Sequence, residues 1–207
     1  MKYKIIADTH LSHTNLLKYE PSRIQKMQME GYNNFDNFLV DWINLHIDKN
    51  DNIIHLGDVA FKDGYKYAKQ LNGNFTLIKG NHDKKLHLDF YKSIGWKVIE
   101  DIQIDLPHSI HNQLKRFNKN ILTKTACLIK DIDNKRILFS HYPIFNDNPY
   151  DEKYKPITEI LEFLFYTLNC DINIHGHTHS YKIDDTRCIN ACLEMNEFLP
   201  LEMNFII

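Results

Sequence analysis

The chain has 207 residues and a formal net charge of −2 at pH 7. That length is enough to bury a core of two sheets, and we expect a single domain over residues 1–207. The near-neutral net charge argues against broad, non-specific binding to nucleic acid. It does not exclude a local strip of basic residues. No apolar stretch approaches the length of a membrane span, so no membrane association is expected.

The cysteines and the first strand indicate the cellular compartment. The four cysteines form no C-x-x-C pair, which argues against a zinc ribbon. We interpret them as reduced thiols of a cytosolic protein. A candidate metal ligand, Asp8, lies inside the first predicted strand, which leaves no room for a signal peptide. The protein is therefore expected to be cytoplasmic, and its oligomeric state is not indicated.

The first half of the chain alternates strand patterns with helix patterns. Runs of β-branched and apolar residues predict strands over 2–8, 52–56 and 75–79. Helical periodicity predicts a helix from Thr14 that Pro21 stops, and further helices over 34–49, 65–71 and 86–94. Strands and helices in this order indicate parallel strands joined by crossover helices.

The second half of the chain has more strands and fewer helices. The predicted strands lie at 96–104, 125–130, 136–139, 171–175, 181–183, 187–193 and 199–206. Asp133-Asn134 predicts a hairpin turn, and Pro156 opens a helix predicted over 157–168. This mixture of parallel and hairpin segments indicates two sheets packed face to face with helices outside.

One segment between these strands, residues 106–124, contains no acidic residue. Phe117 lies there among four cations, which are Lys115, Arg116, Lys119 and Lys124. Such a mixture can grip a nucleic-acid backbone and stack a base. A solvated, mobile loop is the alternative interpretation of the same residues.

Five short groups of metal-ligand residues stand where predicted strands end. In chain order they are Asp8-Thr9-His10, Gly57-Asp58, Gly80-Asn81-His82-Asp83, Ser140-His141-Tyr142 and His175-Gly176-His177-Thr178-His179. Each group reads as a tight turn after a buried strand, so the side chains are expected to converge at the sheet edges. The sequence therefore predicts a single polynuclear metal site.

This series resembles the signature of the calcineurin-like metallophosphoesterase superfamily, which reads D-x-H, G-D, G-N-H-[DE], a lone His after a strand, and G-H-x-H. All of these elements are present in that order between residues 8 and 179. The run from Asp8 to Asn15 is similar to a group of small bacterial and phage phosphoesterases. The resemblance implies an α/β fold, namely a four-layer αββα sandwich of two mixed β-sheets flanked by helices.

The resemblance also implies a dinuclear metal centre. By position in the signature, the ligands of the first metal are Asp8, His10 and His179. Those of the second metal are Asn81, His141 and His177, and Asp58 bridges the two. Imidazole, carboxylate and amide ligands suit manganese, iron, zinc, nickel and cobalt, so two of these divalent ions are expected, with manganese favoured in vitro.

His82 is the residue that separates an enzyme from a metal-binding scaffold. In the superfamily the corresponding histidine is no ligand, and it lies near the leaving oxygen as a general acid or as a stabiliser of phosphoryl charge. Asp83 is expected to accept the ring proton of His82 and to fix its tautomer. The alternative for His82 is a structural histidine.

Four further residues are candidates for contact with the substrate. His13 and Asn15 are either polar groups at a helix start or lie behind the ligands and reach the substrate. Arg23 is a candidate phosphate contact, with a surface arginine as the alternative. Tyr142, together with Tyr150 in the loop after it, is placed to contact the organic part of an ester.

The residues and the resemblance together imply a dinuclear metal-dependent phosphoesterase. It would hydrolyse a phosphodiester or a nucleotide by attack of a metal-bridging hydroxide, with His82 as general acid. The expected partner is a small phosphate ester or nucleotide, because the chain has no room for the domains that dock phosphoproteins. A nuclease that takes DNA or RNA is one alternative. A non-catalytic, metal-stabilised binding module is another, and the retained His82 argues against it.

Overall fold

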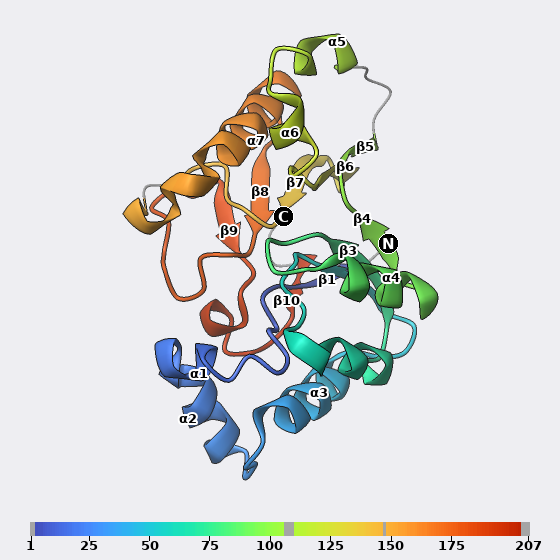
Figure 1. The fold of residues 1–207 in the computed structure, drawn as a ribbon, viewed down its shortest axis with the longest axis vertical. Helices are drawn as coiled ribbons and strands as arrows, with labels where there is room; N and C mark the ends of the chain where they lie inside the picture. The colour runs from blue at the N-terminus through green and yellow to red at the C-terminus, as the bar shows by residue number, and fades with distance from the viewer. Residues whose placement is uncertain (1–2, 106–109, 147, 204–207) are drawn as a thin grey trace.

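Two five-stranded sheets form the centre of the fold (Figure 1). The computed structural model describes residues 3–105, 110–146 and 148–203. The strand order is β10-β1-β2-β3-β4 in the first sheet and β5-β6-β7-β8-β9 in the second. Each sheet contains both parallel and antiparallel pairs, as the sequence predicts.

The first sheet consists of β1 (Tyr3–Ile6), β2 (Asn52–His55), β3 (Asn74–Ile78), β4 (Lys97–Ile99) and β10 (Leu201–Glu202). Strands β1 to β4 run parallel, and β10 pairs antiparallel with β1. Parallel strands need crossover connections, which helical segments supply here. They are α1 (Leu16–Tyr19), α2 (Pro21–Met29), α3 (Phe35–His46), a 3₁₀ helix over Lys62–Gln70, and α4 (Lys85–Ser93).

The second sheet consists of β5 (Ile102–Asp105), β6 (Cys127–Ile132), β7 (Lys135–Ser140), β8 (Ile172–His175) and β9 (Cys188–Asn190). The predicted hairpin turn joins β6 to β7, with φ angles of 47° at Asp133 and 65° at Asn134. The helical segments of this half are α5 (His111–Leu114), α6 (Lys119–Leu122), a 3₁₀ helix over Pro149–Tyr154, α7 (Lys155–Thr167), and a 3₁₀ turn over Leu193–Met195.

Adjacent residues of a strand belong to different apolar clusters, because successive side chains point to opposite faces of a sheet. Ile6 and Ile53 belong to the cluster that the first sheet shares with α3 and α4. Their neighbours Ile5 and Ile54 belong to a cluster between the two sheets. In the second sheet, Leu138 packs in a third cluster with residues of α7. Helices thus cover the outer face of each sheet, which makes a four-layer αββα sandwich (Figure 1).

The carboxyl ends of strands from both sheets meet at one place. In the first sheet, β1 ends just before Asp8 and β2 just before Asp58. In the second sheet, β7 and β8 run parallel and end before His141 and His177. An isolated β-bridge between Ala7 and Cys192 also ties the end of β1 to the chain after β9. The fold therefore brings the predicted ligand turns together.

Some predicted elements have different boundaries in the structure. Residues 96–104 form two strands rather than one, because the chain crosses from the first sheet to the second at Glu100-Asp101. Apolar alternation on both sides of this charged pair hides the crossing from a sequence pattern. Pro21 follows the end of α1 and is also the first residue of α2. At that position a backbone N–H has no partner within the helix, so its absence in proline costs no hydrogen bond. Residues 181–183 form no strand.

The segment predicted as a loop or a basic strip contains two short helices, α5 and α6. Phe117 packs against Phe163 of α7, with 5.2 Å between ring centroids, and Arg116 lies over the same ring. Phe117 is therefore occupied within the fold. Residues 106–109 of this segment, and residues 204–206 of the last predicted strand, lie outside the described part of the chain. Among the described residues, no helix has the length and apolar character needed to cross a bilayer.

Burial of the β7 face that packs against α7 can be tested by mutation. Leu138 is 0% exposed under α7, so Leu138→Ala is expected to lower the free energy of unfolding by about 2–5 kcal/mol. Leu45→Ala, at a position 73% exposed on α3, is the matched control, and a change within about 0.5 kcal/mol is expected. Urea denaturation measures both. Equal, small effects would mean that α7 does not cover the second sheet.

Candidate metal centre

Five of the candidate ligand residues share an unusual backbone conformation. Their φ angles are 55° at Asp8, 49° at His10, 57° at Asp58, 69° at His177 and 47° at His179. Residues with a Cβ rarely adopt such angles, and each strained position costs about 1–3 kcal/mol unless its surroundings enforce it. Strain of this kind concentrates at functional sites, and here it follows directly on the strand ends.

Two glycines of the motifs make room for the carboxylates. A Cβ on Gly80 would lie 2.3 Å from Oδ1 of Asp58, and a Cβ on Gly176 would lie 2.4 Å from Oδ2 of Asp8. Both distances are shorter than any real contact, so a side chain at either position would displace a carboxylate. The glycines in G-N-H and G-H-x-H are therefore required by the packing of Asp58 and Asp8.

Asp8, His10 and His179 form a first cluster. Oδ1 of Asp8 lies 3.3 Å from Nε2 of His10 and 3.9 Å from Nε2 of His179. Oδ2 of the same carboxylate accepts the backbone N–H of His177 at 2.8 Å, and the thiol of Cys192 lies 3.3 Å away. The ligand atoms of the three residues lie within 4.8 Å of one another, which is close enough to hold a metal ion.

Asp8, Asp58 and His141 form a second cluster within the same limit of 4.8 Å. Oδ2 of Asp58 lies 3.6 Å from Nε2 of His141 and 3.8 Å from Nε2 of His10. Asp58 thus stands between a histidine of the first cluster and a histidine of the second. This is the position that a bridging carboxylate needs.

His141 touches more acceptor atoms than it has protons. Its Nδ1 lies 2.7 Å from the backbone carbonyl of Leu56, and its Nε2 lies 2.9 Å from Oδ1 of Asn81. Complete burial lowers the pKa of His141 to about 3, so the ring is neutral near pH 7 and carries one N–H. With that proton on Nδ1, the lone pair of Nε2 faces the amide oxygen of Asn81. A cation that both atoms coordinate would satisfy both.

The charges of the centre also favour a cation. Burial, together with the negative charges of Asp8 and Asp83, raises the pKa of Asp58 well above its usual value. Burial acts on Asp8 in the same direction, but contacts with His10 and the charges of His141 and His179 lower the pKa of Asp8 well below its usual value. Without a cation, one carboxylate of the pair is ionised at the expense of the other.

His177 approaches the centre from the second sheet and contacts a residue outside the motifs. Its ring centroid lies 5.0 Å from that of His141 and 4.7 Å from that of Tyr142. Its Nε2 lies 3.2 Å from Oδ1 of Asp151 but makes no hydrogen bond within the described residues, and the nearby carboxylate charge favours a proton on Nε2 and a ligand role for Nδ1. The structure thus groups Asn81, His141 and His177, although neither of the two compact clusters includes His177.

Asp83 has a different contact set from the one expected. Its Oδ2 accepts the backbone N–H groups of Asp58 and Gly80, both at 2.8 Å, and its Oδ1 accepts that of Val59 at 3.1 Å. The expected bond from the His82 ring to Asp83 is therefore wrong. A carboxylate next to a histidine in sequence points away from it here, because a tight turn separates the two side chains. Asp83 instead joins the turn after β2 to the turn after β3.

His82 lies at the open side of the centre. Its side chain is 45% exposed, and its Nε2 lies 3.9 Å from Oδ2 of Asp58. The backbone N–H of His82 donates to Oδ1 of the same Asp58 at 2.8 Å. Burial and the neighbouring His13 lower the pKa of His82 to about 4. His82 is the candidate residue best placed to meet a group that arrives from solvent.

The residues predicted to contact the substrate do not all lie at the metal centre. The His13 ring stacks on Phe61 at 3.6 Å and lies 5.3 Å from the His10 ring. Tyr142 is buried against His177 and the Tyr154 ring rather than open to an ester. Asn15 is exposed at the start of α1 and does not cap that helix. Tyr150 is 88% exposed.

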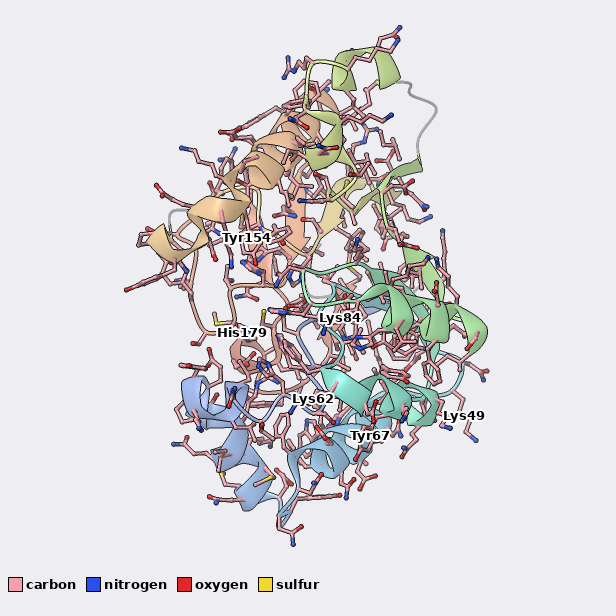
Figure 2. The ribbon with its side chains drawn as sticks, viewed as in Figure 1. Lys49, Lys62, Tyr67, Lys84, Tyr154 and His179 are labelled. Atoms are coloured by element: carbon pink, nitrogen blue, oxygen red, sulfur yellow. The ribbon has the colours of Figure 1, made fainter. Side chains whose placement is uncertain are left out.

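Arg23 is completely buried, which excludes the surface arginine expected as an alternative. Its guanidinium reaches Glu194, and Glu194 in turn reaches Nδ1 of His179. Neither Glu194 nor Asp151 was a sequence candidate. Other acidic residues lie near each of them in the sequence. Only the contact with His179 or His177 in the folded chain marks these two. Figure 2 shows His179 between α1 and the end of the second sheet at β8 and β9.

A cavity of about 590 Å³ adjoins the centre at Asp151. Its wall carries six carboxylates and one lysine. The acidic residues are Asp151, Glu152, Glu159, Glu162, Asp184 and Asp185. The cavity is thus a poor place for an anionic group, and His82 is not among the residues that line it.

Comparisons with known proteins identify the family and the fold of the chain. The calcineurin-like phosphoesterase superfamily domain matches residues 1–193 of the chain. A crystal structure of AQ665, a protein of unknown function from Aquifex aeolicus, is similar with a TM-score of 0.71 and 25% identity, covering 99% of this chain and 97% of that one. A novel archaeal phosphodiesterase is similar with a TM-score of 0.43 and 20% identity, covering 92% of this chain and 82% of that one.

One curated relative shares a shorter segment. An uncharacterized protein from Methanocaldococcus jannaschii is 34% identical over 91 residues, which are 40% of this chain and 47% of that protein. The matched part thus spans about half of the relative. The domain match, by contrast, covers nearly the whole chain and includes all five ligand motifs. The chain belongs to the calcineurin-like phosphoesterase superfamily.

Proposed function

We propose that the protein is a dinuclear metal-dependent phosphoesterase that hydrolyses a phosphodiester or a nucleotide. The observation that supports it most is the contact set of His141, whose neutral ring meets two acceptor oxygens with one proton. The buried pair Asp8 and Asp58 adds negative charge at the same place. Mixed imidazole, carboxylate and amide donors suit divalent transition metals.

In this proposal the ligand roles follow the two clusters. The first ion is held by Asp8, His10 and His179, and the second by Asn81, His141 and His177, with Asp58 shared. When bound, two such ions neutralise phosphoryl oxygens and make water nucleophilic at neutral pH. The chain contributes rigid placement: Asp83 fixes the two turns that hold Asp58 and Asn81, and the carbonyl of Leu56 fixes the His141 ring.

His82 is proposed to hydrogen-bond to the leaving oxygen and to protonate it. Its ring is the exposed one beside Asp58, so a scissile ester can reach it from solvent. Burial and cationic neighbours lower its pKa in the free protein. A bound phosphate anion has the opposite effect, because a negative charge nearby favours the protonated ring. The proton would then be available in the complex and not in the free protein.

A small substrate fits the surroundings better than a polynucleotide. The acidic cavity at Asp151 repels a long polyanion that extends past the second cluster. The aromatic ring of the basic segment, Phe117, is packed against Phe163 and so is not free to stack a base. In Figure 1, α5 and α6 lie at the end of the molecule away from α1 and α2. These observations favour a nucleotide or a small diester over the nuclease alternative.

Metal removal tests the core of this proposal. Hydrolysis of bis-p-nitrophenyl phosphate is expected to stop after treatment with EDTA, because none of the proposed roles includes a covalent nucleophile. Reloading with Mn²⁺, Ni²⁺ or Zn²⁺ is expected to restore it. The measurement is a rate for each reloaded sample, with metal content determined in parallel. Full activity in a sample proven free of metal would contradict the proposal.

The role of His82 can be tested through the leaving group. His82→Ala is expected to lower kcat on an alkyl or nucleoside ester by about 10²–10⁴-fold, because a poor leaving group needs a proton. On a p-nitrophenyl ester the loss is expected to be much smaller, since p-nitrophenolate leaves without help. His46→Ala, at a histidine on α3 that bonds to the carbonyl of Trp42, is the matched control. Similar losses on both esters would show charge stabilisation instead of acid catalysis.

A further inference from the structure

Two carboxylates outside the motifs each contact one histidine of the His177-Thr178-His179 turn. Oε1 of Glu194 lies 3.2 Å from Nδ1 of His179, and Oδ1 of Asp151 lies 3.2 Å from Nε2 of His177. The contacts thus fall on different ring nitrogens. A carboxylate on one nitrogen of an imidazole fixes the proton there and leaves the other nitrogen free to bind a metal.

The Glu194 contact is rigid because Arg23 holds it. Nε and Nη2 of Arg23 both lie 2.6 Å from Oε1 of Glu194, and the Glu194 side chain is 1% exposed. Arg23 itself is completely buried in α2. A buried guanidinium paired with a carboxylate is costly to disturb, since removal of one partner leaves the other charge uncompensated. Oε1 is therefore kept in one place, facing His179.

Arg23 also holds the backbone of the first cluster. Its Nη2 donates to the carbonyl of Asp8 at 2.7 Å, and its Nη1 donates to the carbonyl of Thr9 at 3.0 Å. These carbonyls flank the strained positions Asp8 and His10. One side chain thus contacts the backbone of Asp8 and of Thr9, which directly precedes His10, and it reaches His179 through Glu194.

The Asp151 contact is held from the second half of the chain. Nδ2 of Asn146 donates to Oδ2 of Asp151 at 2.9 Å, which leaves Oδ1 to face His177. Asp151 lies in the 3₁₀ helix before α7, and its side chain is 15% exposed. This carboxylate is held by a neutral amide and not by a buried cation. Nε2 of His177 makes no hydrogen bond within the described residues, so Asp151 acts on it through its charge at 3.2 Å. Asp151 is therefore the weaker of the two constraints.

We infer that Glu194 and Asp151 are positioning residues that set opposite tautomers in the two histidines, one for each metal. Glu194 holds the proton of His179 on Nδ1 and presents Nε2, whereas Asp151 holds the proton of His177 on Nε2 and presents Nδ1. Arg23 supports the first of these contacts. The inference rests on the proposed dinuclear centre and adds two carboxylates and an arginine to the seven ligands of that proposal.

A separate cation site at Glu194 is the competing interpretation. Ligand atoms of Glu20, His179 and Glu194 lie within 4.8 Å of one another, and Oε2 of Glu194 is buried without a hydrogen-bond partner. The Arg23 guanidinium, however, already neutralises Glu194 at 2.6 Å and would repel a second cation. Glu20 instead accepts the hydroxyl of Ser180 at 3.1 Å. Glu20→Gln is therefore the matched control for Glu194→Gln.

The tautomers can be read directly in metal-free protein. Long-range ¹H–¹⁵N correlation spectra of ¹⁵N-histidine-labelled protein at pH 8.5 are expected to show His179 with its proton on Nδ1 and His177 with its proton on Nε2. Glu194→Gln is expected to change the His179 pattern alone, and Asp151→Asn the His177 pattern alone. Glu20→Gln and Glu152→Gln are expected to leave both unchanged. The same tautomer for both histidines in the wild type would overturn the inference without reliance on any variant.

Metal affinity gives a second readout. Equilibrium titration with Mn²⁺ is expected to show one ion weakened by about 10–100-fold in Glu194→Gln and the other in Asp151→Asn, with no change in the two controls. A wild type that binds no Mn²⁺ would remove the proposed function. A wild type that binds two ions, with unchanged affinities in both variants, would overturn the positioning role alone. Equal weakening in Glu20→Gln and Glu194→Gln would favour the separate cation site.

Discussion

The structure depends on acceptor atoms that lie close together, most of them buried, with too few protons between them. His141 is the clearest case, because it meets the carbonyl of Leu56 on one side and the amide oxygen of Asn81 on the other. Asp8 and Asp58 lie in the same buried space and compete for ionisation. An arrangement of this kind is unfavourable by itself, since a buried acceptor without a partner costs roughly 1–3 kcal/mol. A divalent cation resolves the conflict.

The surrounding chain keeps this unfavourable arrangement in place. Asp83 accepts three backbone N–H groups and so ties the turn after β2 to the turn after β3. Arg23 ties the turn after β1 to the 3₁₀ turn that carries Glu194. Gly80 and Gly176 let two carboxylates approach the backbone closely. The strain stored at the ligand positions is thus offset by contacts that lie mostly outside the ligand set.

The sequence was sufficient to predict the convergence of the motifs and the sandwich of two mixed sheets. The convergence and the two packed sheets follow from local patterns along the chain, whereas the four-layer αββα sandwich was implied by the resemblance to the superfamily. Interactions between distant residues were not visible. Arg23 and Glu194 are 171 positions apart, and neither shows from its neighbours that it will be buried in an ion pair. The same holds for the crossing between sheets at Glu100-Asp101, where two short strands read as one.

Local sequence also misled at one residue of the site. Asp83 follows His82 directly, which suggested a hydrogen bond between their side chains. The turn geometry instead points Asp83 into the protein, where backbone N–H groups satisfy it, and leaves His82 at the open side. Adjacent residues in a tight turn can face opposite directions, so spacing alone does not decide which of them interact. Asp83 therefore acts on the site through the backbone and not through the His82 ring.

The most direct test of a cation between proton-poor acceptors is anomalous diffraction from crystals loaded with Mn²⁺. Two peaks about 3.5–4 Å apart are expected, as in other two-metal sites. One peak is expected within bonding distance of both Nε2 of His141 and Oδ1 of Asn81, and the other within bonding distance of Oδ1 of Asp8. A structure in which these atoms are bridged by protein or water hydrogen bonds, with no anomalous peak within bonding distance of them, would contradict the account.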